Sequence, residues 1–221
     1  MDIRRYFKVM EKESAIPPSV RHALDAESWI EQGMLPILFE KSDEFSKSKK
    51  IEYNFDELWS LHPAEYGVVK YGDKIINTPR WQQSYCLPYY YSGMMHEAMP
   101  LPQAFKAFQD WSNSLEIGEF NQVLINWYEN GGHYISRHSD HEQQIIPDSP
   151  IMSISLGQTR TFRIRNKNDD KIVLDLPMPD QSYVIMGGKM QKRFLHEVPK
   201  VNGAKGEAMG RRINITLRKF H

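Results

Sequence analysis

The sequence predicts an α+β fold with a jelly-roll core, that is, a double-stranded β-helix, flanked by helices. Residues up to about 120 contain apolar positions at helical spacing, whereas later residues form short runs rich in β-branched and aromatic side chains. Turn-forming residues separate eight such runs, which is typical of two packed antiparallel sheets whose mouth can hold a ligand. The runs lie at residues 121–128, 133–139, 150–155, 160–165, 171–176, 182–187, 194–198 and 211–219.

The length favours one folded domain preceded by a tail. The chain has 221 residues, which suffice for one sizeable core but hardly for two. Residues 1–18 are expected to form a flexible tail that ends at a pair of prolines. The domain is then expected to span residues 19–221, with helices and a lid in residues 19–120 and the jelly roll in residues 121–221.

The composition favours an intracellular protein. Lys plus Arg and Asp plus Glu number 28 each, so any surface for nucleic acid must be local. The single cysteine, Cys86, excludes an internal disulfide and fits a reducing compartment. No run of the sequence approaches the roughly 18 apolar residues of a membrane span. We therefore expect no membrane insertion, a monomer, and a location in the nucleus of a eukaryotic cell or in the cytoplasm.

The segment before residue 121 predicts helices and one hairpin. Apolar residues at helical spacing predict helices over residues 19–33 and 101–115. Asn54 precedes a short apolar pattern and is a residue type that caps helix starts. Residues 68–76 form two short strand-like runs around a Gly-Asp turn, which predicts a hairpin with Tyr71 at its tip.

Two histidines and one aspartate predict a metal site. His138 and Asp140 are two positions apart, so on a strand their side chains would point to the same face. His196 lies in a later predicted strand that could lie beside the first. Such a set is the facial triad of non-haem Fe(II) oxygenases, which leaves coordination positions open. His-x-Asp also occurs by chance in surface turns, and the ligand types alone leave Zn²⁺ or Mn²⁺ open.

The last predicted strand carries a polar face with an arginine at each end. Arg212, Asn214, Thr216 and Arg218 alternate with apolar residues and so share one side of the strand. The two arginines lie roughly 20 Å apart along the strand, a span that their side chains and a dicarboxylate between them could bridge. The alternative is an amphipathic strand whose basic face is solvated.

Together these motifs resemble the AlkB family of Fe(II)- and 2-oxoglutarate-dependent dioxygenases, from about Tyr71 to Phe220. They are Asn126-Trp127-Tyr128, His138-Ser139-Asp140, Pro150-Ile151, Ser155-Leu156-Gly157, Arg160-Thr161-Phe162, His196 and Arg212 to Arg218. The resemblance implies an enzyme that binds Fe(II) through His138, Asp140 and His196 and also uses O₂. It implies that Asn126, Tyr128, Arg212, Asn214 and Arg218 line the 2-oxoglutarate site. It further implies oxidative removal of alkyl groups from bases, with release of succinate, CO₂ and formaldehyde.

An upstream segment resembles the nucleotide-recognition lid of the eukaryotic branch of DNA and RNA demethylases. The matching residues are Pro79-Arg80-x-Gln82 and Tyr89-Tyr90-Tyr91-Ser92-Gly93. The resemblance implies that Tyr91 stacks on a flipped base and that Glu142 accepts a hydrogen bond from the exocyclic amine of the base. Arg80 and Tyr89 are further implied substrate contacts, and Tyr71 matches an aromatic finger inserted into a duplex. The implied substrates are N1-methyladenine and N3-methylcytosine in single- or double-stranded DNA, with RNA left open.

The sequence leaves other functions open. Ile3, Tyr6 and Phe7 resemble the spacing of a sliding-clamp binding box, although the usual glutamine is absent and the tail could instead pack on its own domain. A second enzyme hypothesis keeps the metal site but gives it a protein, lipid or small-molecule substrate. A third hypothesis is a non-catalytic nucleic-acid or clamp-binding module, against which the full set of metal ligands argues.

Overall fold

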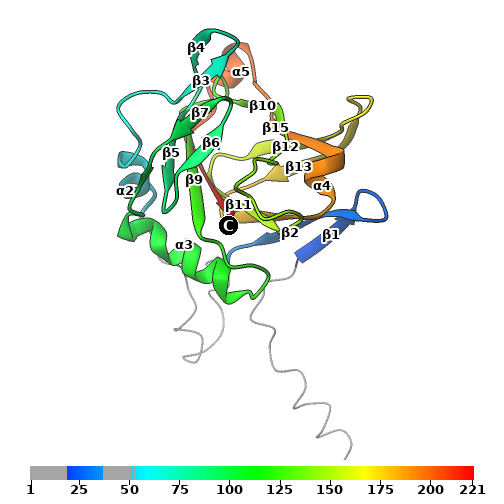
Figure 1. Cartoon of the computed structure of the whole chain (residues 1–221). Coiled ribbons are helices and arrows are strands. Elements are labelled where there is room, and N and C mark those ends of the chain that lie inside the picture. The colour runs from blue at the N-terminus through cyan, green and yellow to red at the C-terminus, as the bar shows by residue number, and fades with distance from the viewer. Residues whose placement is uncertain (1–18, 37–50, 52) are drawn as a thin grey trace, which may run out of the picture.

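The computed structural model describes residues 19–36, 51 and 53–221, which form two facing sheets (Figure 1). The larger sheet has the strand order β1 (Ser19–Ala23), β2 (Ser28–Met34), β14 (Ser182–Gly188), β11 (Ile151–Gly157), β16 (Arg212–Arg218), β9 (Gln122–Tyr128), β5 (Trp81–Tyr85) and β8 (Ala98–Met99). The smaller sheet has the order β10 (Ile135–His138), β15 (Phe194–Val198), β12 (Arg160–Asn166) and β13 (Ile172–Met178). Each predicted run after residue 120 corresponds to one of these strands, so the predicted double-stranded β-helix is confirmed.

The predicted helix over residues 19–33 is wrong, because these residues form the β1–β2 hairpin at one end of the larger sheet. The apolar positions of this segment fit the spacing of a helix and also that of a strand. Strand β2 pairs with β14 along its whole length, and this pairing determines that the segment is a strand. Val20, which would lie on the apolar side of the predicted helix, is 61% exposed. Trp29 lies across Gly187 of β14, where an added Cβ would come within 2.1 Å of its indole ring.

The other elements predicted before residue 121 are confirmed. Helix α2 (Phe55–Ser60) begins after Asn54, whose side-chain oxygen accepts hydrogen bonds from the N–H groups of Asp56 and Glu57. Helix α3 (Gln103–Ser114) buries Phe105 and Phe108. The remaining elements are the hairpins β3 (Val68–Tyr71)–β4 (Lys74–Asn77) and β6 (Tyr89–Tyr91)–β7 (Met94–His96), and the short helices α4 (Met190–Arg193) and α5 (Gly203–Glu207). Within the described ranges, no helix is both long and apolar enough to cross a membrane.

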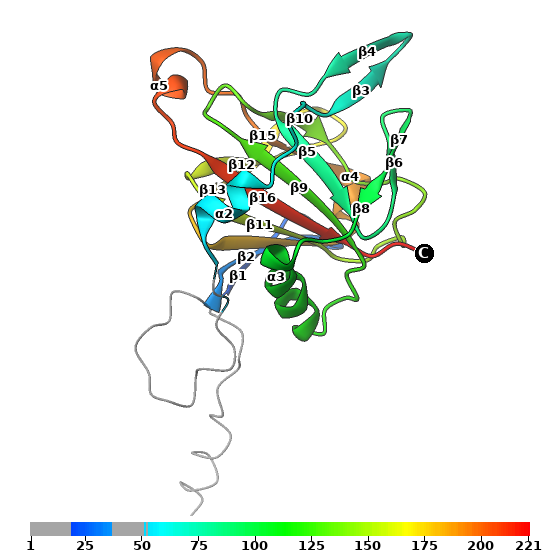
Figure 2. The ribbon, with the colours of Figure 1, turned by 90° about the vertical axis from the view of Figure 1, so that its left-hand side faces the viewer.

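The larger sheet has a different environment on each face. Helices α2 and α3 cover one face, and the smaller sheet lies on the other (Figures 1 and 2). Strand β16 shows the consequence: Ile213, Ile215 and Leu217 join the core beneath the helices. Its alternate residues, from Arg212 to Arg218, instead line a cavity between the sheets. The alternation predicted from the sequence is therefore the alternation between an apolar core and a polar cavity.

Arg160 holds the loop between β9 and β10 in place. Its side chain is 3% exposed and donates hydrogen bonds to the carbonyls of Asn130, Gly131, His133 and Pro199, at 2.8 to 3.4 Å. Burial lowers the pKa of Arg160 to about 10, so the guanidinium is still charged at neutral pH. Four carbonyls of two separate loops thus depend on one side chain.

We expect Arg160→Met to lower the free energy of unfolding by about 3 kcal/mol, because it leaves buried carbonyls without a donor. Urea denaturation measures the change. The matched control is Arg137→Met, which removes an exposed arginine paired with Asp170 and should cost less than about 0.5 kcal/mol. Equal losses in the two variants would contradict the role assigned to Arg160.

Candidate active site

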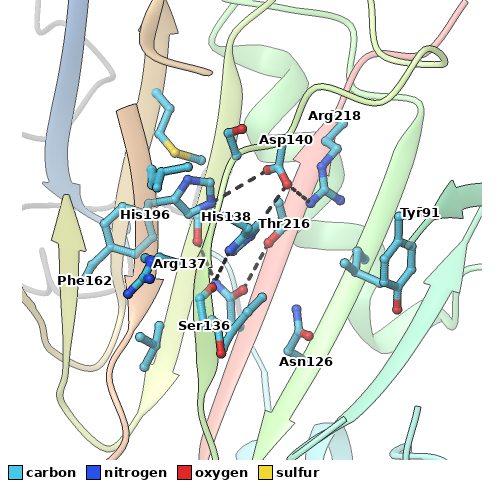
Figure 3. A pocket seen from close by; sticks show the side chains of 18 of the residues that line it. Tyr91, Asn126, Ser136, Arg137, His138, Asp140, Phe162, His196, Thr216 and Arg218 are labelled. Carbon is cyan, nitrogen blue, oxygen red and sulfur yellow. Dashed lines mark hydrogen bonds and ion pairs between the residues drawn. The ribbon is translucent and has the colours of Figure 1, made fainter. Parts of the chain in front are cut away.

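A cavity of about 660 Å³ lies between the two sheets and the β6–β7 hairpin. Its walls come from β9 and β16 of the larger sheet, from β10 and β15 of the smaller sheet, and from the hairpin. Figure 3 shows His138, Asp140 and His196 on one side of this cavity and Tyr91 on the opposite side. The metal ligands expected from the sequence and the expected base-stacking residue therefore face the same space.

The three expected metal ligands converge. One ligand atom of each residue lies within 4.8 Å of those of the other two. The Nε2 atoms of His138 and His196 lie 3.8 and 3.9 Å from the two carboxylate oxygens of Asp140. His138 is the last residue of β10 and pairs directly with His196 of β15. Asp140 lies beyond the end of β10, so strand alternation is not what turns it toward the histidines; the loop after the strand does this.

The protonation of these groups suits a divalent cation. The Nδ1 atom of His138 is 2.8 Å from the carbonyl oxygen of Ser136, so Nδ1–H donates to it and the Nε2 lone pair faces Asp140. Burial lowers the pKa of His138 and lowers the pKa of His196 to about 3, so both imidazoles are neutral. Burial alone would raise the pKa of Asp140, but the charged guanidinium of Arg218, which also donates a hydrogen bond to it, holds that pKa well below its usual range.

The donor set therefore fits Fe(II). Two neutral imidazoles and one ionised carboxylate are ligands that such a cation prefers. One carboxylate oxygen of Asp140, Oδ2, is buried and has no hydrogen-bond partner in the described part of the chain. Buried polar atoms are normally paired, and a cation bound among the three residues would be the partner of this oxygen.

Asp140 is fixed from two sides. The Nη2 atom of Arg218 donates to Oδ1 at 3.1 Å, and the backbone N–H of Asp140 donates to Oε1 of Gln191 at 2.9 Å. Gln191 lies on the single turn α4, and it is a positioning residue that the sequence did not reveal. No sequence motif marks it, since the contact depends on how α4 returns toward the loop.

We expect Gln191→Leu to weaken metal binding by about 10- to 100-fold, because residues that hold a ligand in place contribute on this scale. Titration with Co²⁺, followed by visible absorption, gives the dissociation constant without a catalytic assay. Gln143→Leu, which changes an exposed glutamine of the neighbouring loop, is the control. An unchanged dissociation constant in Gln191→Leu would show that the contact with Asp140 does not support the site.

Arg212 offers an anion two free donors. It is buried, its Nη2 donates to Oγ of Ser155 at 2.7 Å, and its guanidinium carbon lies 4.9 Å from the ring centroid of Tyr128. Its Nε and Nη1 atoms are buried and lack partners among the described residues. Asn126 accepts from Arg80 at 2.6 Å through Oδ1, which leaves its amide nitrogen available to a ligand. This arrangement fits the far carboxylate of 2-oxoglutarate, and the solvated basic face considered for β16 is excluded.

Some of the expected contact residues support the site instead of facing a ligand freely. The amide nitrogen of Asn214 already donates to Oγ of Ser153 at 2.7 Å and to the carbonyl of Ile154 at 2.9 Å. Arg80 is buried and donates to Asn126 and Gln82. The ring centroid of Tyr89 lies 4.9 Å from the guanidinium carbon of Arg218.

Tyr91 and Glu142 line the cavity, together with Arg80 and Tyr89. Tyr91 stands opposite His138 (Figure 3), and Glu142 comes two residues after Asp140. The Oε2 atom of Glu142 is buried and has no hydrogen-bond partner within the residues described. The side chain of Tyr71 and the residues Ile3, Tyr6 and Phe7 lie outside the described residues, although the predicted hairpin that carries Tyr71 is present.

We expect Arg212→Met to weaken 2-oxoglutarate binding by about 30- to 100-fold, because charged hydrogen bonds contribute about 1.5–3 kcal/mol. Calorimetric titration in the presence of Mn²⁺ measures the dissociation constant. The control is Arg211→Met, which removes the neighbouring exposed arginine that pairs with Asp56 on the other side of the sheet. If both variants bind 2-oxoglutarate like the parent chain, the carboxylate site has been misplaced.

Comparison with known proteins agrees with a site for Fe(II) and 2-oxoglutarate. The sequence profile of the 2OG-Fe(II) oxygenase superfamily matches residues 46–218. The human DNA oxidative demethylase ALKBH2 is 29% identical over 154 residues, which cover 65% of this chain and 58% of that protein. The rat alpha-ketoglutarate-dependent dioxygenase alkB homolog 3 is 32% identical over 150 residues, which cover 61% of this chain and 48% of that protein.

The fold is also found among solved structures. The structure of OsALKBH1 aligns with a TM-score of 0.52 over 74% of this chain and 90% of that chain, at 16% identity. This likeness concerns the fold alone. In sequence, the chain spans about half to three-fifths of the length of the two relatives above.

Proposed function

Because this chain belongs to the 2OG-Fe(II) oxygenase superfamily, we propose that it is an AlkB-type dioxygenase that demethylates bases in nucleic acid. Fe(II) and 2-oxoglutarate are the cofactors of the family, and the triad and Arg212 fit them. When bound with O₂, they supply the oxidation of an N-methyl C–H bond to C–OH while 2-oxoglutarate becomes succinate and CO₂. The hydroxymethyl group then leaves as formaldehyde and the base nitrogen is restored.

The proposed substrate rests on one observation about the cavity. The cavity that holds the triad also contains an aromatic ring, Tyr91, and a partnerless carboxylate oxygen of Glu142, as far as the described residues extend. A flat base fits beside the ring, and an exocyclic amine can donate to the carboxylate. N1-methyladenine and N3-methylcytosine have both features and carry a positive charge that a carboxylate attracts. We propose these two bases as substrates, in DNA and also in RNA.

Each of these cavity residues would have its own role in the reaction. Tyr91 and Glu142 would orient the base so that its methyl group faces the triad, and Arg212 would hold the far carboxylate of the co-substrate. Arg218 would hold Asp140, and Tyr89 packs against Arg218 from the lid side. The two relatives, a DNA oxidative demethylase and an alkB homolog, support this proposal.

The predicted contact between a sliding clamp and Ile3, Tyr6 and Phe7 stays a prediction, because these residues lie outside the described ranges. The division into a tail and a domain, the monomeric state and the nuclear or cytoplasmic location likewise stay predictions.

The proposal is tested with single-stranded oligonucleotides that carry one N1-methyladenine or N3-methylcytosine. We expect mass spectrometry to show the loss of one CH₂ unit that requires Fe(II), 2-oxoglutarate and Asp140. Glu142→Gln should lower kcat/KM by about 10- to 100-fold, because a charged acceptor becomes a neutral one. Glu119→Gln, which changes an exposed glutamate paired with Lys219, is the control and should have little effect.

Each alternative gives a different result. Intact oligonucleotides together with steady conversion of 2-oxoglutarate to succinate would mean that the metal site works on a protein, lipid or small-molecule substrate. Intact oligonucleotides without succinate, from folded protein, would favour a non-catalytic module. Duplex and RNA versions of the same oligonucleotides then compare the forms of nucleic acid.

A further inference from the structure

A second cavity, of about 390 Å³, lies beside the first at the edge of the larger sheet. It is bounded by β5, β9 and the segment that runs from β7 to β8. Figure 2 shows the β6–β7 hairpin beside β8, and residues of these three strands line the cavity. Tyr91 and Leu124 line both cavities, so the two spaces are neighbours that share a wall.

The shared wall is a pair of stacked rings. The ring centroids of Tyr91 and His96 lie 3.9 Å apart, and the ring planes differ by 17°. Tyr91 contributes to both cavities and His96 to the second. The two rings are therefore arranged like two members of a stack of flat groups, with a cavity next to each end.

Three residues that line the second cavity carry polar atoms that lack partners. Gln82 is 7% exposed, and its Oε1 accepts from Arg80 at 2.9 Å, which directs the amide nitrogen away from Arg80. That nitrogen, the Nε2 atom of His96 and the hydroxyl of Tyr91 are buried without hydrogen-bond partners in the ranges that the structure describes. Since buried polar groups are normally paired, a ligand with polar edges is favoured over a purely apolar one.

Two exposed methionines line the second cavity, beside the polar side chains of Gln83 and Glu97. Met95 and Met99 are 50% and 55% exposed, which is unusual for residues of their size. Thioether side chains adapt their shape and pack well against aromatic rings. Thioether and polar side chains together, next to stacked rings, suit a flat heteroaromatic group with hydrogen-bonding edges.

We propose that the second cavity binds the nucleobase next to the target base, so that Tyr91 and His96 form a two-ring wedge between consecutive bases. The inference rests on the proposed function and extends it. A neighbouring base is tethered to the target base, so its effective concentration at the adjoining cavity is high. The target base stacks on Tyr91, the neighbouring base stacks on His96, and the wedge replaces the contact that the two bases lose.

The proposal makes His96 a substrate-positioning residue that does not touch the target base. The enzyme thereby depends on the presence of a base on one side of the lesion. Because stacking against a ring tolerates any base, the dependence is on the presence of the base more than on its identity.

The experiment uses single-stranded oligonucleotides with one N1-methyladenine and an abasic site at its 5′ or its 3′ neighbour. We expect one of these two abasic sites to lower kcat/KM about tenfold, which is within the range of one stacked base, and the other to have little effect. His96→Ala should lower kcat/KM on the intact oligonucleotide by the same factor. In this variant, kcat/KM should be equal on the intact oligonucleotide and on the oligonucleotide with the sensitive abasic site. His96→Phe, which keeps a ring, should restore the advantage, and His22→Ala on β1 is the control.

A structural readout accompanies the kinetics. 5-Iodouridine at the sensitive neighbour should photo-crosslink to the peptide that contains residues 94–99, as mapped by mass spectrometry. Demethylation that is equal on intact and both abasic oligonucleotides, with no such crosslink, would overturn the wedge and leave the proposed function standing. If the wild-type chain demethylates none of the oligonucleotides, both the proposed function and the wedge are contradicted.

Discussion

The site depends on the buried ion pair between Asp140 and Arg218. Both residues are 3% exposed, and the pair joins the loop after β10 to the end of β16, in different sheets. A buried charge is costly unless it is paired and hydrogen-bonded, so each of these residues requires the other. The carboxylate that the pair keeps ionised is the one that faces the two histidines. One contact thus joins the two sheets at the metal site and keeps the carboxylate of that site charged.

The two faces of β16 explain how this contact can sit inside a small domain. Its apolar residues lie under α2 and α3 in one core, while its arginines face the cavity. The helices keep water from the far side of the sheet, so the strand is held rigidly where its polar side chains must be placed. Because the side chains of any strand alternate between its two faces, a single strand contributes to the core on one face and to the site on the other.

The sequence predicted what depends on local pattern and missed what depends on long-range pairing. Eight strands and the helix α3 follow from periodicity. The triad was predicted from its side-chain types, but the loop after β10, and not the expected strand alternation, places Asp140. The residues of β1 and β2 have apolar positions that suit a helix equally well, and pairing with β14 decides between the two. Gln191 and the Tyr91–His96 stack escaped prediction because each is a contact between segments that the sequence does not mark as neighbours.

The unpaired donors of Arg212 have a consequence for the protein outside catalysis. With the carboxylate site empty, two buried nitrogen atoms of a charged side chain lack partners in the described chain, which costs about 1–3 kcal/mol per unsatisfied group. A dicarboxylate that fills the site removes this cost and binds the folded state alone, so it shifts the folding equilibrium as its concentration rises. The lifetime of the folded protein in a cell would then follow the supply of its own co-substrate, and starvation for that metabolite would reduce the amount of enzyme as well as its rate.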